Sequence, residues 1–187
     1  MRRGDMEAQP PAPSQCLKEE NMIPSSIGFI PIGIIHSPHT KAEKTPIQPC
    51  YAADCVGHIE IFPEYAEGLR DLEGYSHIYL IFCFHKASSP RLVVKPFLQD
   101  VERGVFSTRA PCRPNPLGLS IVRLLGKERN ILHIDSVDIL DGTPLLDIKP
   151  YSKRFDCIEG TRNGWQDSVS EEDARHRGQR GYHPEEC

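Results

Sequence analysis

The hydrophobic positions of this chain gather in short runs that glycine, proline and polar residues separate. The runs are rich in β-branched and aromatic side chains, which is the pattern of β-strands. We expect strands in six segments: residues 27–36, 55–62, 75–85, 117–125, 131–140 and 145–148. Many short strands with few helices predict a mainly β fold, either a barrel or a sandwich. Closure into a barrel would leave no exposed sheet edge.

The pattern also predicts how two of these strands are connected. Within 117–125, Leu117, Leu119, Ile121 and Leu125 fall on one face, with Arg123 as the exception. Residues 126–130 then indicate a hairpin loop that leads into the next strand. There the apolar parity changes near residues 135–136, which indicates a β-bulge or a strand buried on both faces. Residues 141–144 have the composition of a tight turn.

Helical signals are few. Residues 62–74 combine an early proline, acidic residues in the first turn and a terminal glycine, which predicts one helix. A second, short helix is expected to begin at Ser170, with Asp173 as its capping-box partner. No glycine-rich turn follows a strand and no strand–helix alternation occurs. This argues against a doubly wound nucleotide-binding fold.

The length of 187 residues suits one domain with tails. Residues 1–26 and 152–187 are poor in apolar periodicity, so we expect both to lie outside the core and the first to be disordered. No apolar run is long enough to span a bilayer, and the charged start does not resemble a signal peptide. The sequence therefore predicts a soluble protein whose core occupies residues 27–151.

Cysteine and histidine usage bears on redox state and metals. Seven cysteines without a C-x-x-C pair favour reduced thiols in the cytoplasm over disulfides or a thiolate zinc site. His36 and His39 flank a Ser-Pro pair, but nothing else completes a metal-binding spacing. We expect structural histidines and no metal.

The formal net charge of −4 is unevenly distributed. Between residues 86 and 129 there are nine basic residues and three acidic ones. A basic surface on an acidic protein suits an anionic partner, because such attraction is felt within about 10 Å. A solvated basic face is the alternative, and charge asymmetry alone leaves both open.

One loop has unusually little conformational freedom. Residues 106–120 contain three prolines, and each fixes its own φ and restricts the residue before it. The same loop carries Arg109, Arg113 and Asn115. Because ordering a stiff loop on binding costs little entropy, this segment is the strongest candidate for a binding site.

Six motifs occur in order at residues 32–37, 45–48, 72–77, 104–109, 113–120 and 141–151. Together they resemble the TrmO family (YaeB/TsaA-like) of S-adenosylmethionine-dependent tRNA (adenine-N6)-methyltransferases, which act on threonylcarbamoyladenosine beside the anticodon. The resemblance covers residues 27–151. It implies a single-sheeted β-barrel, a homodimer with the cofactor site near the subunit interface, and tRNA as partner. Longer members carry a small C-terminal domain thought to help hold tRNA, and only 36 residues follow Tyr151 here.

The resemblance also implies a set of residues that hold S-adenosylmethionine: Pro46, Ile47, Gln48, Ser76, His77, Arg109, Leu119, Asp141, Gly142, Thr143 and Pro144. A guanidinium at Arg109 suits the methionyl carboxylate or the adenosine. Its structural alternative is an ion pair with Asp141 or Asp147. A structural role is also open for His77, and a core position for Leu119.

Methyl transfer to an amine requires alignment of donor and acceptor and exclusion of water. A hydrogen-bond acceptor on the adenine N–H would help the nitrogen to react, and Asn115 is the candidate. The alternative is a turn residue whose side chain binds nearby backbone. Arg113 has three open roles: the cofactor, a tRNA phosphate, or the carbonyls of its own loop. Direct transfer needs no covalent intermediate, so we assign Cys112 no nucleophilic role.

We therefore expect a cytoplasmic homodimeric methyltransferase acting on N6 of an adenosine in tRNA. Its catalytic residues would be Asn115 and Arg113, and its RNA surface would include Lys86, Arg91, Lys95 and Arg123. Two alternatives remain: the same pocket methylating another RNA or a small molecule, and a non-catalytic module that only binds the cofactor.

Overall fold

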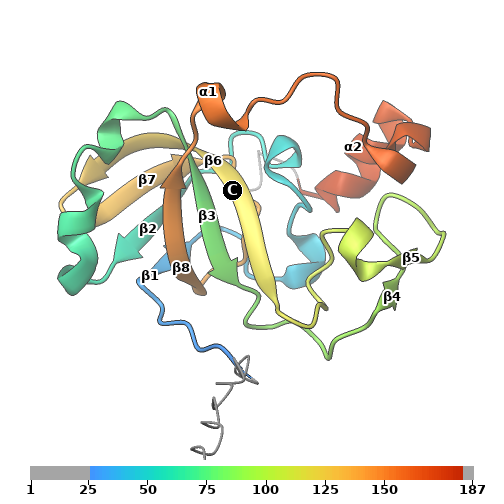
Figure 1. Cartoon of the computed structure of the whole chain (residues 1–187), viewed down its shortest axis with the longest axis horizontal. Helices are drawn as coiled ribbons and strands as arrows, with labels where there is room; N and C mark the ends of the chain where they lie inside the picture. The colour runs from blue at the N-terminus through green and yellow to red at the C-terminus, as the bar shows by residue number, and fades with distance from the viewer. Residues whose placement is uncertain (1–25, 183–187) are drawn as a thin grey trace, which may run out of the picture.

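A computed structural model describes residues 26–182, which form a closed antiparallel barrel with a small lobe and a C-terminal helix at its side (Figure 1). The strands of the barrel follow one another in the order β1-β2-β7-β6-β3-β8. Their bounds are β1 Gly33–His36, β2 Gly57–Ile61, β3 His77–Cys83, β6 Leu117–Glu128, β7 Ile131–Asp135 and β8 Thr143–Pro150. The expected single-sheeted barrel is confirmed.

The remaining elements are short. The lobe between β3 and β6 holds a separate two-stranded sheet of β4 Val93–Val94 and β5 Arg103–Gly104. The two α-helices are α1 Lys153–Asp156 and α2 Glu171–Gln179. Short 3-10 helices occupy Ala42–Lys44, Pro49–Tyr51, Pro63–Leu69, Leu72–Gly74, Val105–Ser107 and Gly164–Ser168.

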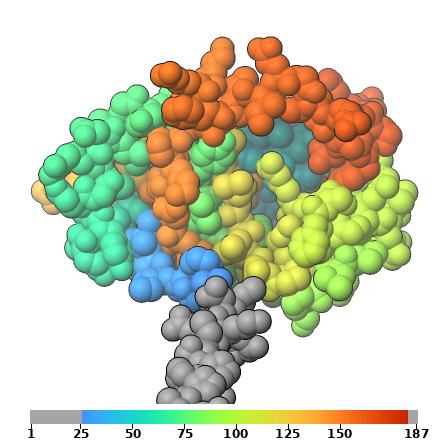
Figure 2. All heavy atoms as spheres, in the orientation of Figure 1, coloured from blue at the N-terminus to red at the C-terminus, as the bar shows by residue number. Residues whose placement is uncertain are grey.

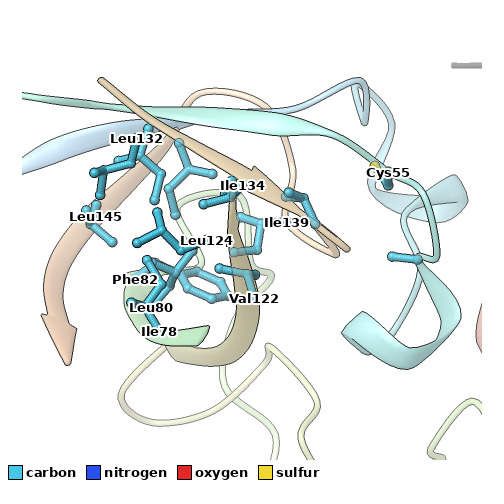
Figure 3. Close-up of a cluster of buried hydrophobic side chains, with 14 of the residues drawn as sticks. Cys55, Ile78, Leu80, Phe82, Val122, Leu124, Leu132, Ile134, Ile139 and Leu145 are labelled. Carbon is cyan, nitrogen blue, oxygen red and sulfur yellow. The ribbon is translucent and has the colours of Figure 1, made fainter. Parts of the chain in front are cut away.

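The barrel interior is filled by alternate side chains of its strands, so it is a packed core (Figure 3). These side chains come from all six strands and from the loop after β7, and they include Ile35, Ile59, Leu80, Val122, Leu132, Ile139 and Leu145. Phe82 lies opposite Gly118 on the neighbouring strand, and its ring occupies the space that a side chain at Gly118 would need.

Strand β6 presents its apolar face outward. Its inward positions are Gly118, Ser120, Val122 and Leu124, whereas Leu117, Leu119, Ile121 and Leu125 point out of the barrel. The apolar face grouped from the sequence is therefore real, but it is the outer one. Leu119 is 48% exposed, so its alternative assignment to the core is wrong.

Several local expectations need correction. Residues 62–74 form two 3-10 turns instead of one α-helix, because Asp71 between them adopts a left-handed conformation with φ of 65°. The parity change near residue 135 marks the end of β7, where Ser136 has φ of 63°, and not a bulge within a longer strand. Regular pairing of the first strand begins only at Gly33. The hairpin after β6 is confirmed, with only residues 129–130 in its turn.

The C-terminal segment is more involved in the fold than its composition indicates. The helix start at Ser170 is confirmed, because the Ser170 hydroxyl accepts a hydrogen bond from the Asp173 amide at 3.1 Å. The expectation that residues 152–187 lie outside the core is wrong for Tyr182, which is 6% exposed and packs with the barrel core. The expected disorder of residues 1–26 falls, except for Ser26, outside the described residues. Across residues 26–182 no helix has the length and apolar character to cross a membrane.

Candidate functional site

Arg109 is held at the surface by a braced loop. The Thr108 hydroxyl donates to the Val105 carbonyl at 2.9 Å, and the Arg113 guanidinium donates to the Thr108 carbonyl at 2.9 Å and the Ala110 carbonyl at 3.4 Å. The exposed guanidinium of Arg109 donates a hydrogen bond to the side-chain carbonyl of Gln48, 61 positions away in sequence. The structure therefore brings together two residues that the family resemblance assigns to the cofactor.

Neither ion pair offered as the alternative for Arg109 is present. Asp147 pairs with Lys149, at 2.9 Å between carboxylate and ammonium. Asp141 faces His36. Of the three roles open for Arg113, the contact with its own loop is the one that the structure contains. Its guanidinium stabilises the loop conformation that presents Arg109.

A carboxyl group near Arg109 is a site residue that the sequence analysis missed. Asp138 lies in the loop after β7, half-buried, and accepts a hydrogen bond from the inward-facing Ser120 hydroxyl at 2.7 Å. Burial raises the pKa of Asp138 to about 7, and the nearby Arg109 charge opposes this shift. Burial also raises the pKa of the Cys50 thiol, and the charge of Asp138 adds to that effect. The sequence feature that could have pointed to Asp138 is its position between two apolar residues, Val137 and Ile139, both of which are buried.

This pKa shift predicts a pH-dependent stability. The folded protein keeps the Asp138 proton at pH values where the unfolded chain, with a pKa of 3.8, has released it. The contribution of the Asp138 carboxyl to the free energy of unfolding of the wild type is therefore lost as the pH rises from about 4 to about 7. In Asp138→Asn the amide carbonyl still accepts from Ser120 but does not titrate. Between pH 4 and 8 the wild type should lose about 4 kcal/mol more unfolding free energy than the variant. Urea unfolding at several pH values measures this, and parallel curves for the two proteins would contradict it.

The turn at Asp141–Gly142 is anchored to the end of β1. The Asp141 carboxylate accepts from the Ser37 amide at 3.1 Å and lies 3.4 Å from the His36 ring nitrogen. Gly142, with φ of 73°, donates its amide to the Ile35 carbonyl at 3.0 Å. Thr143, buried at the start of β8, donates its hydroxyl to the Leu140 carbonyl at 2.6 Å. Pro144 already belongs to β8. The corner is rigid, and Asp138 lies three residues before it.

The two histidines considered for a metal have structural partners. His39 is buried, its Nε2 is 2.8 Å from the Val137 carbonyl and 3.2 Å from the Cys55 sulfur, and burial lowers its pKa. The His36 ring stacks on His58 of the neighbouring strand, with ring centroids 4.7 Å apart. In the described part of the chain no three His, Cys, Asp or Glu side chains are arranged to hold a metal ion.

Ser76 and His77 lie at the end of the β3–β6 pairing opposite to Leu117, which follows the proline loop. The Ser76 hydroxyl is 3.0 Å from His77 Nδ1, and His77 pairs with Arg123 across β3 and β6. Leu119 lies four residues from Arg123 along β6, which corresponds to about 14 Å. The outer face of β6 between these points carries the exposed Leu119 and Ile121. A ligand that contacts both the Arg109–Gln48 pair and the Ser76–His77 pair would therefore have to lie along this face. Otherwise a second copy of the chain would have to supply one of the two pairs.

A hollow opens beside β6 in the space-filling view (Figure 2). The C-terminal segment, β6 and the lobe surround it, and the part of the chain coloured as residues near 50 forms its floor. Asn115 lies two residues before β6 and is exposed. Over residues 26–182 its side chain makes no hydrogen bond, so the alternative of a side chain bound to nearby backbone is wrong. The amide is free to contact a ligand.

The fold and site together define a small antiparallel barrel with an arginine-bearing proline loop beside a cluster of polar side chains. The profile of the tRNA-methyltransferase O N-terminal domain matches residues 34–157. The chain belongs to the TrmO family.

Individual relatives agree. A protein of Pyrococcus abyssi named "Probable S-adenosyl-L-methionine-binding protein" is 54% identical over 144 residues, covering 77% of this chain and 78% of its own. The "tRNA (adenine(37)-N6)-methyltransferase" of Escherichia coli K12 is 38% identical over 137 residues, covering 68% of this chain and 58% of its own. The crystal structure of TrmO from Pseudomonas aeruginosa has a TM-score of 0.63 at 40% identity, covering 75% of this chain and 62% of its own.

Proposed function

We propose that this protein binds S-adenosylmethionine and transfers its methyl group to N6 of threonylcarbamoyladenosine next to the anticodon of tRNA. The observation that carries the proposal is the Arg109–Gln48 pair close to Asp138, because it joins a cation and an amide beside a carboxyl that Ser120 anchors. A ligand that bears a carboxylate, a cationic centre and an adenine suits this combination.

The cofactor residues have separate tasks in this proposal. Arg109 binds the methionyl carboxylate, and Gln48, carried between Ile47 and a 3-10 turn, orients Arg109 through its carbonyl. Leu119 offers an apolar surface for the adenine. The remaining contacts come from Pro46, Ile47, Ser76, His77 and the corner Asp141, Gly142, Thr143 and Pro144. Bound there, the sulfonium supplies an activated methyl group.

The acceptor base would lie at the rim of the hollow. Asn115 accepts from the N6–H of the adenine and so favours attack by the nitrogen lone pair, while Arg113 keeps the loop in place. The nitrogen forms a bond to the methyl carbon as the carbon–sulfur bond breaks, and the nitrogen then loses a proton. Four exposed basic residues, Lys86, Arg91, Lys95 and Arg123, are the proposed contacts to tRNA phosphates. Binding of tRNA should therefore weaken steeply with salt.

The outer face of β6 supports a homodimer. Leu117, Leu119, Ile121 and Leu125 form an apolar stripe with exposed fractions of 37% to 48%, which is more than one strand face of a monomer usually leaves to water. A second copy packing beside this stripe would place the cofactor site near the interface. Light scattering should give twice the chain mass of 21.1 kDa. A monomer at micromolar concentration would contradict the dimer.

The activity is tested by incubating the protein with methyl-labelled S-adenosylmethionine and tRNA, followed by mass spectrometry of the nucleosides. tRNA containing threonylcarbamoyladenosine should gain one methyl group, and tRNA lacking that modification serves as the control. If the protein binds S-adenosylmethionine but methylates neither tRNA, the acceptor is another RNA or a small molecule, or the protein only binds the cofactor. The Pyrococcus abyssi relative, named for binding alone, keeps these alternatives in view.

A further inference from the structure

The C-terminal helix α2 lies beyond residues 34–157, the part of the chain that the family profile matches. It nevertheless packs against the segment of residues 42–53 that carries Gln48, and Figure 1 shows it beside this segment and above the lobe. We call residues 177–182, the last turn of α2 and the residues after it, the clamp.

Two contacts of the clamp reach the backbone beside Gln48. The Ile47 amide donates to the Gly178 carbonyl at 3.0 Å, which fixes the residue before Gln48. Gly178 is buried against the Tyr51 ring, and a Cβ built on it would lie 2.5 Å from Tyr51 Cδ2. Only glycine lets the helix approach so closely. The position of Gln48 thus depends on the position of α2.

Arg180 joins the same segment to the lobe. Its guanidinium donates to the Ala42 carbonyl at 2.6 Å and to the Thr45 carbonyl at 3.4 Å, and it lies 4.1 Å from the centroid of the Phe97 ring. Both hydrogen bonds come from one nitrogen, Nη1, while the planar guanidinium stacks on the ring, and lysine does not reproduce this stacking. Next to it, Arg177 pairs with Asp100 of the lobe at 3.0 Å.

Tyr182 closes the far end of the clamp. Its hydroxyl is 3.3 Å from the Ala53 carbonyl, and its ring meets His39 edge-on at 5.3 Å between centroids. The clamp therefore holds the Gln48 segment at both ends and the lobe at one side. That lobe leads into the loop that carries Arg109.

We propose that the clamp is a positioning element of the S-adenosylmethionine site, which sets the placement of Gln48 opposite Arg109 and so determines cofactor affinity. This inference rests on the proposed function. Residues 42–53 contain only single 3-10 turns, and ordering a loose segment on binding costs conformational entropy. A segment already ordered by the clamp does not incur this cost when the cofactor binds.

Arg180→Ala tests the clamp in the full-length protein. Calorimetry with S-adenosylmethionine and S-adenosylhomocysteine, well below the melting temperature, should show Kd values raised about tenfold or more. Arg180→Lys should recover only part of the affinity. Arg175→Ala removes the same charge from the exposed side of α2 and should leave both Kd values unchanged. Hydrogen exchange should become faster at the Ile47 amide in Arg180→Ala, which a general loss of stability would not confine to this segment.

Gly178→Ala provides an independent test. The added methyl group collides with Tyr51, so cofactor affinity should fall as in Arg180→Ala, and Tyr51→Leu in the same chain should restore part of it. If the folded Arg180→Ala and Gly178→Ala variants bind the cofactor as the wild type does, the clamp inference is wrong and the proposed function stands. If the wild type itself binds no S-adenosylmethionine, the proposed function fails, and the inference fails with it.

Discussion

Arg109→Ala is expected to raise the Kd for S-adenosylmethionine about 10- to 100-fold, because hydrogen bonds to a charged group contribute about 1.5–3 kcal/mol. The guanidinium is exposed and already oriented by its hydrogen bond to Gln48. Removing it leaves the methionyl carboxylate without a cationic partner and Asp138 without its neighbouring positive charge. Calorimetry measures the affinity, and single-turnover methylation of tRNA at saturating cofactor measures whether alignment is lost as well.

Arg70→Ala is the matched control for Arg109→Ala. Its guanidinium is exposed, and its ion pair with Glu67 lies in the Pro63–Leu69 turn and its capping residue. The control loses the same charge at the surface, so it should bind the cofactor as the wild type does. Because Arg109 is also exposed, its loss should change the melting temperature little. A wild-type Kd in Arg109→Ala would remove this residue from the cofactor site and with it the main support for the proposed function.

The strands were predictable because their determinants are local: short β-branched runs between turn residues predict them. The pattern left a barrel and a sandwich both open, and the family resemblance implied the closed barrel that the structure has. The capped start of α2 at Ser170 was predictable for the same reason, since a cap is read within four residues. Where the local signal was ambiguous, at residues 62–74, a left-handed Asp71 decided the outcome, and such a residue has no reliable signature in one sequence.

The orientation of β6 was not predictable from its pattern. Its inward positions near the proline loop are Gly118 and Ser120, which no hydrophobicity rule assigns to a core. They fit inside because Phe82 fills the space over Gly118 and Asp138 accepts from Ser120. Both facts depend on neighbouring strands. The apolar residues then fall on the outer face.

The candidate site, too, was predictable where the signal is local and not where it depends on tertiary contacts. Motifs near Gln48 and Arg109 pointed to both residues, and the structure joins them. Asp138 and the clamp went unnoticed because their importance comes only from tertiary contacts with Ser120 and with the Gln48 segment. A charged C-terminal segment of low apolar content looks like a solvated tail until Gly178 and Tyr182 are seen packed against the barrel side.

Gly118→Ala should be among the most destabilising small substitutions in the barrel, lowering the free energy of unfolding by about 3 kcal/mol. A Cβ at this position overlaps the Phe82 ring, which is buried and packs edge-on against Phe84 at 5.2 Å between centroids, so the ring has no free space to enter. Urea unfolding measures the loss. Gly74→Ala is the control, because nothing lies within 4 Å of its added methyl group.

The overlap of Gly118 with Phe82 also predicts how the loss is repaired. Phe82→Leu alone should destabilise the barrel by leaving space over Gly118, whereas Gly118→Ala combined with Phe82→Leu should be more stable than the sum of the two losses allows. Strictly additive effects would mean that the ring can move aside. Gly118 is the second residue of β6, directly after the part of the loop that carries the prolines. The double variant should therefore also bind S-adenosylmethionine more tightly than Gly118→Ala alone. Recovered affinity in the double variant would mean that Gly118 acts through packing. It would let β6 approach the core closely enough to hold the Arg109 loop in place.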